Sequence, residues 1–398
     1  MPERFVSPAE TVVGSGAVDS VGDRMADRGS RALVLATSGV FDRFGQRVRD
    51  SLTDAGIETA VFNEVRPDPT VANVEAALEV YRDADCDCLV TLGGGSPIDT
   101  GKAVGVVAAN GGEIREYATD RAGYEGVPEQ IPPLCAVNTT AGTGSEATRS
   151  IVITDETTST KFLVVSTACV PTVAVEDPEL VRSLPPSHTA FTGIDALTHA
   201  IEAFVSVHAW EMSDTLARSA IDRIVRWLPV AWANGDHIEA REQTLVGQFQ
   251  AGQAFTNSSV ALVHGMARPF GAQLHVPHGL ANAILLPYVM EFSVQGAPER
   301  YAEVARRLGA ADESTPTREA ARAAGPAVRE LCTDVSLYGY LDEFGTVPER
   351  AAYAEVVPEM AADAIASGSP DNNPRKPSRE EVADLYMTVY DDVLEAYR

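Results

Sequence analysis

The segment Cys86-Asp-Cys-Leu-Val-Thr-Leu92 is followed directly by Gly93-Gly-Gly-Ser-Pro97. The first segment is a short and largely apolar run, as in strands that are buried on both faces of a parallel sheet. Three glycines then make a turn, and the residues from Ile98 to about Ala109 favour a helix. A strand, a tight turn and a helix in this order are typical of one half of a strand–helix–strand unit. This part of the sequence therefore predicts an α/β domain.

The same alternation continues on both sides of this stretch. Helices are predicted at 41–56 and 71–82, where apolar residues recur at helical spacing. Short aliphatic runs predict further strands at 31–37, 59–63, 134–138, 149–154, 162–165 and 172–175. Because parallel strands are joined by crossovers that cover the faces of their sheet, we expect helices on both sides of it.

The character of the sequence changes near Leu184-Pro-Pro186. Beyond this point the chain is rich in alanine, has few β-branched runs, and its apolar residues recur with helical periodicity. Near the end, Ser378-Arg-Glu-Glu381 has the pattern of a capping box that opens a helix. We therefore predict an α/β domain at residues 1–184 and an all-helical domain at 185–398. No flexible linker separates them, so a cleft between the two domains is expected.

The charge of the chain limits its partners. It carries 57 acidic residues against 31 basic ones, and only three of the basic residues are lysines, namely Lys102, Lys161 and Lys376. This balance argues against nucleic acids and anionic membranes, since both require a basic surface. Abundant carboxylates with few lysines favour a surface adapted to concentrated salt, where counterions screen repulsion between like charges. A coding bias that replaces lysine by arginine is the alternative.

The sequence also indicates a compartment. No apolar stretch approaches the roughly 20 residues that are needed to cross a bilayer. The first residues lack the basic and apolar regions of a secretory signal. The five cysteines are scattered through the chain, which does not indicate a disulfide framework. We therefore expect a cytoplasmic protein without a membrane partner.

Two loops have the composition of a nucleotide site. Gly93-Gly-Gly-Ser-Pro-Ile-Asp99 joins a strand to a helix, where backbone N–H groups and the helix N-terminus can bind a pyrophosphate. Asn138-Thr-Thr-Ala-Gly-Thr-Gly-Ser-Glu146 follows another predicted strand, and its small hydroxyl residues can surround ribose and phosphate. A plain tight turn and a capped helix start are the structural alternatives. Because both loops follow the carboxyl ends of strands, a dinucleotide is the better interpretation.

A second set of residues has the composition of a metal site. Asp195 and His199 lie four positions apart and therefore on one face of a helix. Together with His264 and His278 they supply a carboxylate and three imidazoles, which suit a borderline divalent ion such as Fe²⁺ or Zn²⁺. His275 is a reserve candidate, because it lies close to His278 in the sequence. The remaining histidines are expected to have no catalytic role: His188, His208 and His237.

These segments together resemble the iron-containing (group III) alcohol dehydrogenases. The resemblance spans essentially the whole chain and rests on Gly93-Gly-Gly-Ser-Pro-x-Asp-x-x-Lys102, Thr139-Thr-Ala-Gly-Thr143, Gly193-x-Asp-Ala-Leu-Thr-His-Ala-Ile-Glu202, Leu262-Val-His-Gly-Met266 and Pro277-His-Gly-Leu-Ala-Asn-Ala-Ile-Leu-Leu-Pro287. It implies a dinucleotide-binding domain at 1–184 and a helical domain that binds metal and substrate at 185–398. This architecture is shared with dehydroquinate synthase. A homodimer or a larger homo-oligomer is implied as well.

The resemblance implies a role for each motif residue. The metal would be coordinated by Asp195, His199, His264 and His278. The pyrophosphate would be met by Gly94, Gly95, Ser96 and Asp99. The nicotinamide and ribose side would be lined by Thr139, Thr140 and Thr143. Lys161 resembles a lysine that binds the ribose, and Phe255 resembles an aromatic wall of the substrate pocket, with core packing as its alternative. For Lys102 a specific role and a solvent-facing helix position both remain open.

The implied activity interconverts a small alcohol and its aldehyde or ketone with NADP(H) or NAD(H). In such enzymes a divalent ion acts as a Lewis acid on the substrate oxygen while a hydride is exchanged with the nicotinamide. A metal- and NAD-dependent lyase of the dehydroquinate-synthase type is the alternative, although the chain has no lysine between 162 and 375 for a phosphorylated substrate. Maleylacetate reductase-like enzymes share the fold but lack the metal ligands, so the four ligands here argue against that class. The intact ligand set also argues against a nucleotide-binding protein that has lost turnover.

Two positions depart from the family pattern. Arg268, expected in the substrate pocket, stands where many relatives have a histidine, and arginine cannot relay protons at neutral pH. His275 is one candidate for that role, and ribose hydroxyls with water are the other. The strand that ends near Thr37 continues into Ser38-Gly39, without the aspartate that NAD-selective relatives place against a 2′-phosphate. These small residues, with Arg43 nearby, favour NADP(H) or the use of both cofactors.

Overall fold

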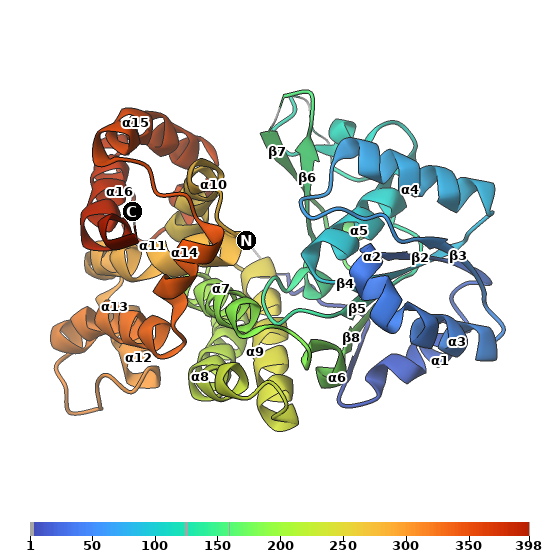
Figure 1. Cartoon of the computed structure of the whole chain (residues 1–398), viewed down its shortest axis with the longest axis horizontal. Helices are drawn as coiled ribbons and strands as arrows, with labels where there is room; N and C mark the ends of the chain where they lie inside the picture. The colour runs from blue at the N-terminus through green and yellow to red at the C-terminus, as the bar shows by residue number, and fades with distance from the viewer. Residues whose placement is uncertain (1–3, 123, 125, 159, 398) are drawn as a thin grey trace. The chain divides into compact units, whose positions relative to one another are not determined.

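The computed structural model describes residues 4–122, 124, 126–158 and 160–397. The chain divides into two compact units, Met1–Ser183 and Leu184–Arg398. Within the described residues, every strand lies in the first unit, and the second unit is built from helices (Figure 1). The predicted fold class, a parallel α/β part followed by an all-helical part, is confirmed.

A six-stranded sheet forms the centre of the first unit. All its neighbouring strands run parallel, in the order β1-β8-β5-β4-β2-β3. The strands are β1 (Glu10–Val13), β2 (Arg31–Ala36), β3 (Glu58–Phe62), β4 (Cys88–Gly93), β5 (Leu134–Asn138) and β8 (Val173–Glu176). The other two strands, β6 (Ser150–Asp155) and β7 (Thr160–Val165), form a separate antiparallel hairpin. Of the strands in the sheet, β1 was not predicted from the sequence.

Helices connect the strands of the first unit. They are α1 (Val21–Met25), α2 (Ser38–Val40), α3 (Gln46–Asp54), α4 (Val71–Asp83), α5 (Gly95–Asn110) and α6 (Pro178–Val181). Short helical turns lie at η1 (Ala17–Ser20), η2 (Phe41–Gly45), η3 (Ile114–Tyr117), η4 (Ser145–Ala147) and η5 (Thr167–Cys169). The predicted helix at 41–56 is thus a π-helical turn that continues into α3.

Both faces of the sheet are buried, as the apolar strands predict. In β2, the residues Ala32, Val34 and Ala36 pack with apolar residues of α1 and α3. Leu33 and Leu35 point to the opposite face and pack with residues of α4 and α5. This alternation follows the period of two of a strand. Each fully buried leucine or valine contributes about 1.5–3 kcal/mol relative to an exposed one.

The sheet has a topological switch point between β2 and β4. From β2 the chain passes through α3 to β3, and it then returns through α4 to β4 on the other side of β2. The connections on the two sides therefore diverge at the carboxyl ends of β2 and β4, which is the place where open α/β sheets generally form a crevice. Thr37 follows the first of these ends, and the glycine turn follows the second. Ligands of open α/β sheets bind at such a point.

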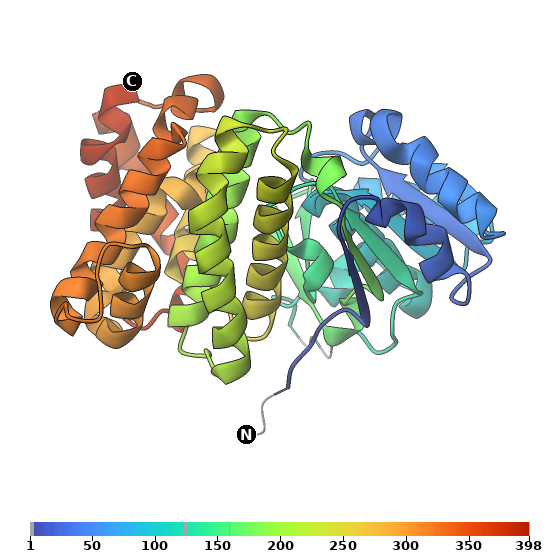
Figure 2. The same ribbon diagram turned by 90° about the horizontal axis from the view of Figure 1, so that it is seen from below.

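The second unit consists of packed helices. They are α7 (Pro186–Val205), α8 (Glu211–Ala233), α9 (Ile238–Thr256), α10 (Leu262–Leu274), α11 (His278–Ser293), α12 (Pro298–Arg307), α13 (Thr317–Asp334), α14 (Leu341–Phe344), α15 (Arg350–Ala366) and α16 (Arg379–Asp392). Short turns lie at η6 (Val294–Gly296), η7 (Leu337–Tyr340), η8 (Ser369–Asn372) and η9 (Leu394–Tyr397). The helices α7, α8 and α9 lie side by side (Figure 2).

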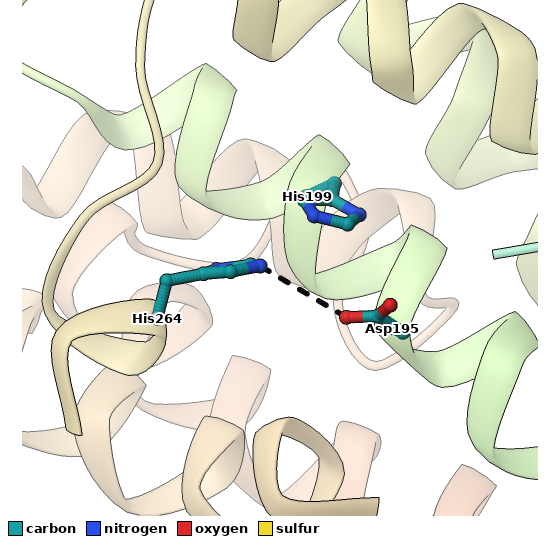
Figure 3. Close-up of side chains that lie close together, drawn as sticks. All are labelled: Asp195, His199 and His264. Carbon is teal, nitrogen blue, oxygen red and sulfur yellow. Dashed lines mark ion pairs between the residues drawn. The ribbon is translucent and has the colours of Figure 1, made fainter. Parts of the chain in front are cut away.

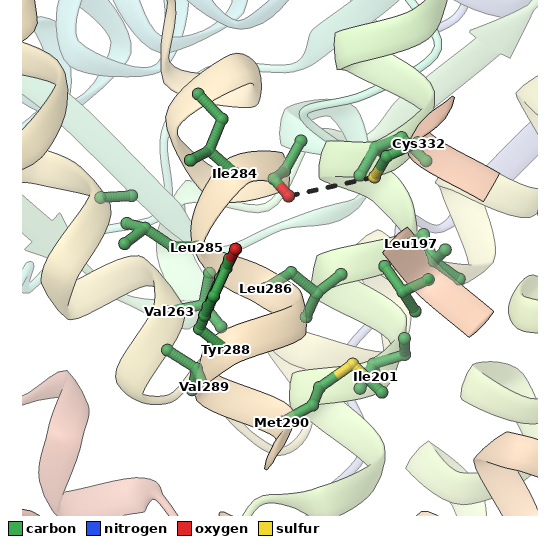
Figure 4. Close-up of a cluster of buried hydrophobic side chains, with 14 of the residues drawn as sticks. Leu197, Ile201, Val263, Ile284, Leu285, Leu286, Tyr288, Val289, Met290 and Cys332 are labelled. Carbon is green, nitrogen blue, oxygen red and sulfur yellow. Dashed lines mark hydrogen bonds between the residues drawn. The ribbon is translucent and has the colours of Figure 1, made fainter. Parts of the chain in front are cut away.

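Two helices of the second unit are buried along most of their length. Leu197 and Ile201 of α7 belong to the same apolar cluster as Leu286 and Met290 of α11 (Figure 4). Helices that are apolar on nearly all sides occupy the interior of a protein, so any polar residue on them is buried too.

The predicted capping box opens α16, where Ser378 Oγ accepts a hydrogen bond of 3.1 Å from a backbone N–H.

The cysteines of the chain are buried thiols. All five cysteines are buried and unpaired. Burial raises the pKa of Cys86 to about 11 and that of Cys88 to about 12, which keeps both as unreactive thiols. Among the described residues, no helix combines the length and the apolar character that a membrane span requires.

Candidate metal and nucleotide sites

One face of α7 carries three polar residues into the interior of the second unit. Asp195, His199 and Glu202 are separated by four and then three positions, so they lie along the same side of the helix. All three are buried. Buried polar side chains must find partners, because a group that loses water without replacement costs about 1–3 kcal/mol.

His264, on α10, completes a cluster with two of these residues. Asp195, His199 and His264 each offer one potential ligand atom, and these atoms all lie within 4.8 Å of one another (Figure 3). His264 Nε2 lies 3.9 Å from Asp195 Oδ1, and the rings of His199 and His264 are stacked with their centroids 4.5 Å apart. Residues far apart in the sequence are therefore brought together around one small volume.

His278, the first residue of α11, lies next to this cluster. Its ring centroid is 5.4 Å from that of His264. Asn282, one turn later, places its Nδ2 atom 2.6 Å from Asp195 Oδ1, 3.1 Å from His278 Nε2 and 3.2 Å from His264 Nε2. Three of the predicted ligand atoms therefore surround a single point. The structure thus brings all four predicted ligands to one place, with His278 the most exposed of them.

The charges in this cluster suit a cation. Burial alone raises the pKa of Asp195, but His199, His278, His264 and Asn282 outweigh it and hold the pKa below its ordinary value. Burial and the two neighbouring imidazoles, His199 and His278, lower the pKa of His264 well below its ordinary value. The cluster therefore presents an ionised carboxylate and a neutral imidazole, which are the protonation states that metal ligands require.

Glu202 holds His264 from the side opposite to the cluster. Its Oε2 lies 2.6 Å from His264 Nδ1, and its Oε1 accepts a 2.6 Å hydrogen bond from the backbone N–H of Val263. Burial raises the pKa of Glu202 to about 7. A carboxylate here accepts the Nδ1 proton, and the Nε2 lone pair is then left facing Asp195. Carboxylate–histidine pairs of this kind orient the ligands of metal sites.

A divalent ion fits these residues. Among the described residues, none forms a hydrogen bond with the buried Nδ1 atom of His199, as is expected of a residue that binds a ligand. The donor set contains one carboxylate and three imidazoles and no thiolate, which suits Fe²⁺ and Zn²⁺. The atoms that converge on Asn282 Nδ2 are one carboxylate oxygen and two imidazole nitrogens, which are the atom types that bind such a cation.

Three further predicted residues have different surroundings. Phe255 stacks on His199 with ring centroids 4.5 Å apart, so it lines the cluster and also packs against the apolar core. Arg268 lies one turn after His264 on α10; burial lowers its pKa, and the charge of Glu202 opposes this. His275 is exposed at the end of α10 in a left-handed conformation, with a φ of 55°.

In the first unit, the glycine turn (residues 93–95) and the threonine loop (residues 139–143) touch each other. A Cβ atom added to Gly94 would lie 2.8 Å from Thr140, and one added to Gly95 would lie 3.2 Å from Thr143. Only residues without a side chain allow this approach. Gly94 is also the N-cap of α5 and provides no side-chain cap, so the first amides of this helix remain available for an anion.

The other predicted cofactor residues of this unit are distributed around these two loops. Ser96 lies in the first turn of α5 and is partly exposed, whereas Thr139 is buried at the end of β5. Thr37 is partly exposed at the carboxyl end of β2. Asp99 is buried and bonded to protein groups. Lys161 is exposed on the hairpin, where its Nζ lies 2.5 Å from Asp68 Oδ1.

Profiles of one protein family match both units. The profile described as iron-containing alcohol dehydrogenase matches residues 8–178, and that of the C-terminal part of the Fe-containing alcohol dehydrogenase family matches residues 189–390. The chain belongs to the iron-containing alcohol dehydrogenase family. The resemblance on which the sequence analysis drew is thereby confirmed.

Individual members of the family align over nearly the whole chain. The 1,3-propanediol dehydrogenase of Citrobacter freundii is 37% identical, over 97% of this chain and 98% of its own. An NAD-dependent methanol dehydrogenase of Bacillus methanolicus is 37% identical over 97% and 99% of the two chains, and lactaldehyde reductase of Escherichia coli is 37% identical over 98% and 100%.

Solved structures agree with this assignment. The structure of 1,3-propanediol oxidoreductase has a TM-score of 0.92 and 36% identity, over 98% of this chain and 100% of that one. An archaeal halo-thermophilic alcohol dehydrogenase from a Red Sea brine pool has a TM-score of 0.88 and 28% identity, over 98% and 99%. This iron-type alcohol dehydrogenase is therefore a metal-dependent oxidoreductase that interconverts alcohols and aldehydes. The lyase alternative finds no support.

Three residues at these sites make contacts that were not predicted from the sequence. Glu202 and Asn282 contact the predicted metal ligands, and Ser145 bonds Asp99. The spacing of Glu202 from His199 on one helix was a readable signal, because it puts the two on one face. Asn282 follows His278 by one helical turn, which is the same kind of signal. Ser145 belongs to the loop that the sequence assigns to the nucleotide, but no local pattern indicates its bond with Asp99.

Proposed function

We propose that this alcohol dehydrogenase holds Fe²⁺ at Asp195, His199, His264 and His278 and uses NADP(H) or NAD(H) on a small alcohol or its carbonyl partner. Zn²⁺ fits the same ligands. One observation carries the proposal: one potential ligand atom from each of Asp195, His264 and His278 lies within 3.2 Å of Asn282 Nδ2. Such convergence of a carboxylate and imidazoles has a clear chemical use as a cation site.

The residues of the second unit would prepare the metal site in separate ways. When bound, the cation supplies Lewis acidity, which lowers the pKa of an alcohol or polarises a carbonyl. Glu202 keeps the Nε2 lone pair of His264 directed into the cluster. Phe255, stacked on His199, gives the cluster an apolar wall that excludes water, which strengthens electrostatic interactions inside.

The residues of the first unit would bind the nicotinamide cofactor. The uncapped N-terminus of α5, at Gly94 and Gly95, would receive the pyrophosphate. Thr140 and Thr143, which pack on these glycines, would line the ribose and the nicotinamide. This placement is supported by the position of the glycine turn at the switch point between β2 and β4.

The cofactor preference is proposed to be NADP(H), with NAD(H) as a second cofactor. Thr37 stands at the carboxyl end of β2, beside the switch point, and Ser38 and Gly39 after it are exposed. No carboxylate occurs there before Asp42, so nothing repels a 2′-phosphate, and Arg43 is exposed in the same segment. The use of NAD by a methanol dehydrogenase of 37% identity supports the second option.

The setting of the enzyme is also part of the proposal. A net charge of −26 with three lysines supports function in concentrated salt, and so does the similarity to a halo-thermophilic alcohol dehydrogenase. We propose a cytoplasmic homo-oligomer that binds neither nucleic acid nor membranes, because its charge is unfavourable for both.

Metal removal tests the function directly. The protein would be purified without oxygen, its metal content measured, and its oxidation of NADPH and NADH followed with a panel of small aldehydes. Activity is expected to disappear on chelation and to return with Fe²⁺. The variants Asp195→Ala and His264→Ala are expected to lose both metal and turnover while they keep the circular dichroism of the parent. Full activity after complete removal of the metal contradicts the proposal.

A further inference from the structure

Lys102 is a charged residue with no exposed surface. It lies on α5, about two turns after the glycine turn, and its relative exposure is 0%. Its Nζ lies 2.6 Å from the carbonyl oxygen of Ser145, 3.0 Å from that of Thr148 and 3.0 Å from that of Ser150. The hydroxyls of Ser145 and Thr148 are within 3.1 and 3.2 Å. Of the two alternatives that the sequence leaves open for Lys102, the solvent-facing helix position is therefore wrong.

Asp99 stands one turn before Lys102 on the same helix face. Its Oδ1 accepts a 2.5 Å hydrogen bond from Ser145 Oγ, and its Oδ2 accepts one of 2.9 Å from the backbone N–H of Val152. Both carboxylate oxygens are thus bonded to the segment that follows the threonine loop. A buried charge without partners costs several kcal/mol, so this pair persists because each charge is hydrogen-bonded and has the other nearby.

The bonded segment continues directly from the threonine loop. Thr140 and Thr143 pack on the glycines at the start of α5, and Ser145 lies two residues after Thr143. The start of helix α5 therefore contacts the threonine loop, and the same helix is hydrogen-bonded to the segment that follows this loop. A shift of residues 145–152 relative to α5 would change the spacing between the glycines and the threonines.

We propose that Lys102 and Asp99 are positioning residues, which clamp the threonine loop to α5 and so set the width of the nucleotide cradle without touching the nucleotide. The proposal rests on the proposed binding of NAD(P)(H) by the first unit. It replaces the expectation that Asp99 meets the pyrophosphate, because both of its oxygens are bonded to protein. It also gives a reason for one of only three lysines in the chain.

The test compares nucleotide binding in matched variants of the metal-loaded enzyme. Lys102→Met removes the charge at nearly constant length, and Lys376→Met makes the same change at an exposed lysine of the second unit. We expect Lys102→Met to raise the dissociation constant of NADPH and NADH, measured by fluorescence titration, by about tenfold or more, since small displacements of binding groups have effects of this size. Metal content and the KM for the alcohol at saturating nucleotide are expected to stay unchanged, as for Lys376→Met.

A double variant separates positioning from contact. Asp99→Asn and Lys102→Met each leave a buried charge without its partner, whereas the combination leaves none, so the double variant is expected to bind nucleotide better than the product of the single losses predicts. Fully additive losses would mean that the two side chains act independently on the nucleotide. An unchanged dissociation constant in Lys102→Met would mean that the contacts of Lys102 do not influence nucleotide binding. Either result overturns the inference.

Two further measurements keep the test decisive. If Lys102→Met does not fold, Ser145→Ala removes the contacts of Ser145 Oγ with Asp99 and Lys102 and leaves the carbonyl contacts of Lys102 in place. A rise of about threefold or more in the same dissociation constant is still expected, in line with the loss of a hydrogen bond. No rise in that variant overturns the inference. Nucleotide binding by the parent enzyme separates a failure of the proposed function from a failure of this inference alone. If the parent binds neither NADPH nor NADH, the proposed function fails, and with it the role assigned to Lys102 and Asp99.

Discussion

Glu202 Oε2 and His264 Nδ1 are 2.6 Å apart, and both residues are buried. This bond fixes the ring of His264 in one orientation, with Nε2 directed toward Asp195. Without it, the imidazole could turn or change its tautomer, and the lone pair that a metal needs would point elsewhere. We therefore expect the proposed metal site to depend on Glu202, which does not belong to the proposed ligand set.

Glu202→Gln tests this dependence. The amide keeps the size of the side chain but removes the charge that favours the Nδ1 proton, so the affinity for Fe²⁺ or Zn²⁺ is expected to fall by about 10–100-fold. Competition with a chromophoric chelator measures the affinity independently of turnover. Glu359→Gln, at an exposed position of α15, is the matched control. Equal affinities in the two variants would show that Glu202 has only a packing role.

Gly279 determines how closely α11 approaches α7. A Cβ atom at this position would lie 2.5 Å from the backbone oxygen of Phe191 and 3.3 Å from Asp195 Cβ. Because the first contact is with backbone, Gly279→Ala must move the two helices apart, and His278 must move with α11. Overpacking of this kind typically costs about 1–3 kcal/mol. We expect a lower melting temperature and weaker metal binding.

The control for this prediction is Gly339→Ala. A Cβ atom at Gly339 meets nothing within 4 Å, so this variant is expected to melt and to bind metal as the parent does. Differential scanning calorimetry and a metal titration measure the two effects. A Gly279→Ala variant that matches Gly339→Ala in both would show that α7 and α11 tolerate the added methyl group and that their close packing does not determine the metal site.

Local sequence patterns predicted most of the sheet but not its edge. The strands near 31–37, 86–92 and 134–138 were found because each is a compact aliphatic run that is buried on both faces. Glu10–Val13 is short, lies at the edge of the sheet and has no run of buried residues, so nothing distinguished it from a loop. The pairing of β6 with β7 in a separate hairpin depends on tertiary contacts that no local pattern contains.

The candidate sites were predictable to a similar extent. The spacing of Asp195 and His199 identified one side of the metal cluster, because four positions make one helical turn. The pattern around Asp99 indicated that the residue belongs to the nucleotide motif, but not whether its carboxylate faces a ligand or the protein. That distinction depends on Ser145 and Val152, which lie about 50 residues away in the sequence and meet Asp99 only in the fold.

Thr37→Asp tests the proposed cofactor preference. A carboxylate at the carboxyl end of β2 would repel a 2′-phosphate and could accept hydrogen bonds from ribose hydroxyls, so kcat/KM is expected to fall with NADPH and to rise with NADH. The ratio of the two values should shift by about tenfold or more, because like charges brought together at a binding site cost several kcal/mol. Thr37→Asn, which is similar in size but neutral, is the control. A parent enzyme that already prefers NADH by a wide margin contradicts the preference itself.

The charge balance predicts how stability responds to salt. With 57 acidic and 31 basic residues, the folded chain concentrates negative charge, and its self-repulsion opposes folding. At 1 M salt the screening length is about 3 Å, so this repulsion is largely removed. Exposed ion pairs such as Arg350–Asp391 contribute only about 0–1 kcal/mol to the free energy of unfolding, so their screening costs little. The melting temperature is therefore expected to rise between dilute buffer and molar KCl, by about 2–4 °C for each kcal/mol gained in a domain of this size. Sucrose at equal osmolality separates screening from general exclusion effects, and an equal rise in sucrose and in KCl would show that charge is not the cause.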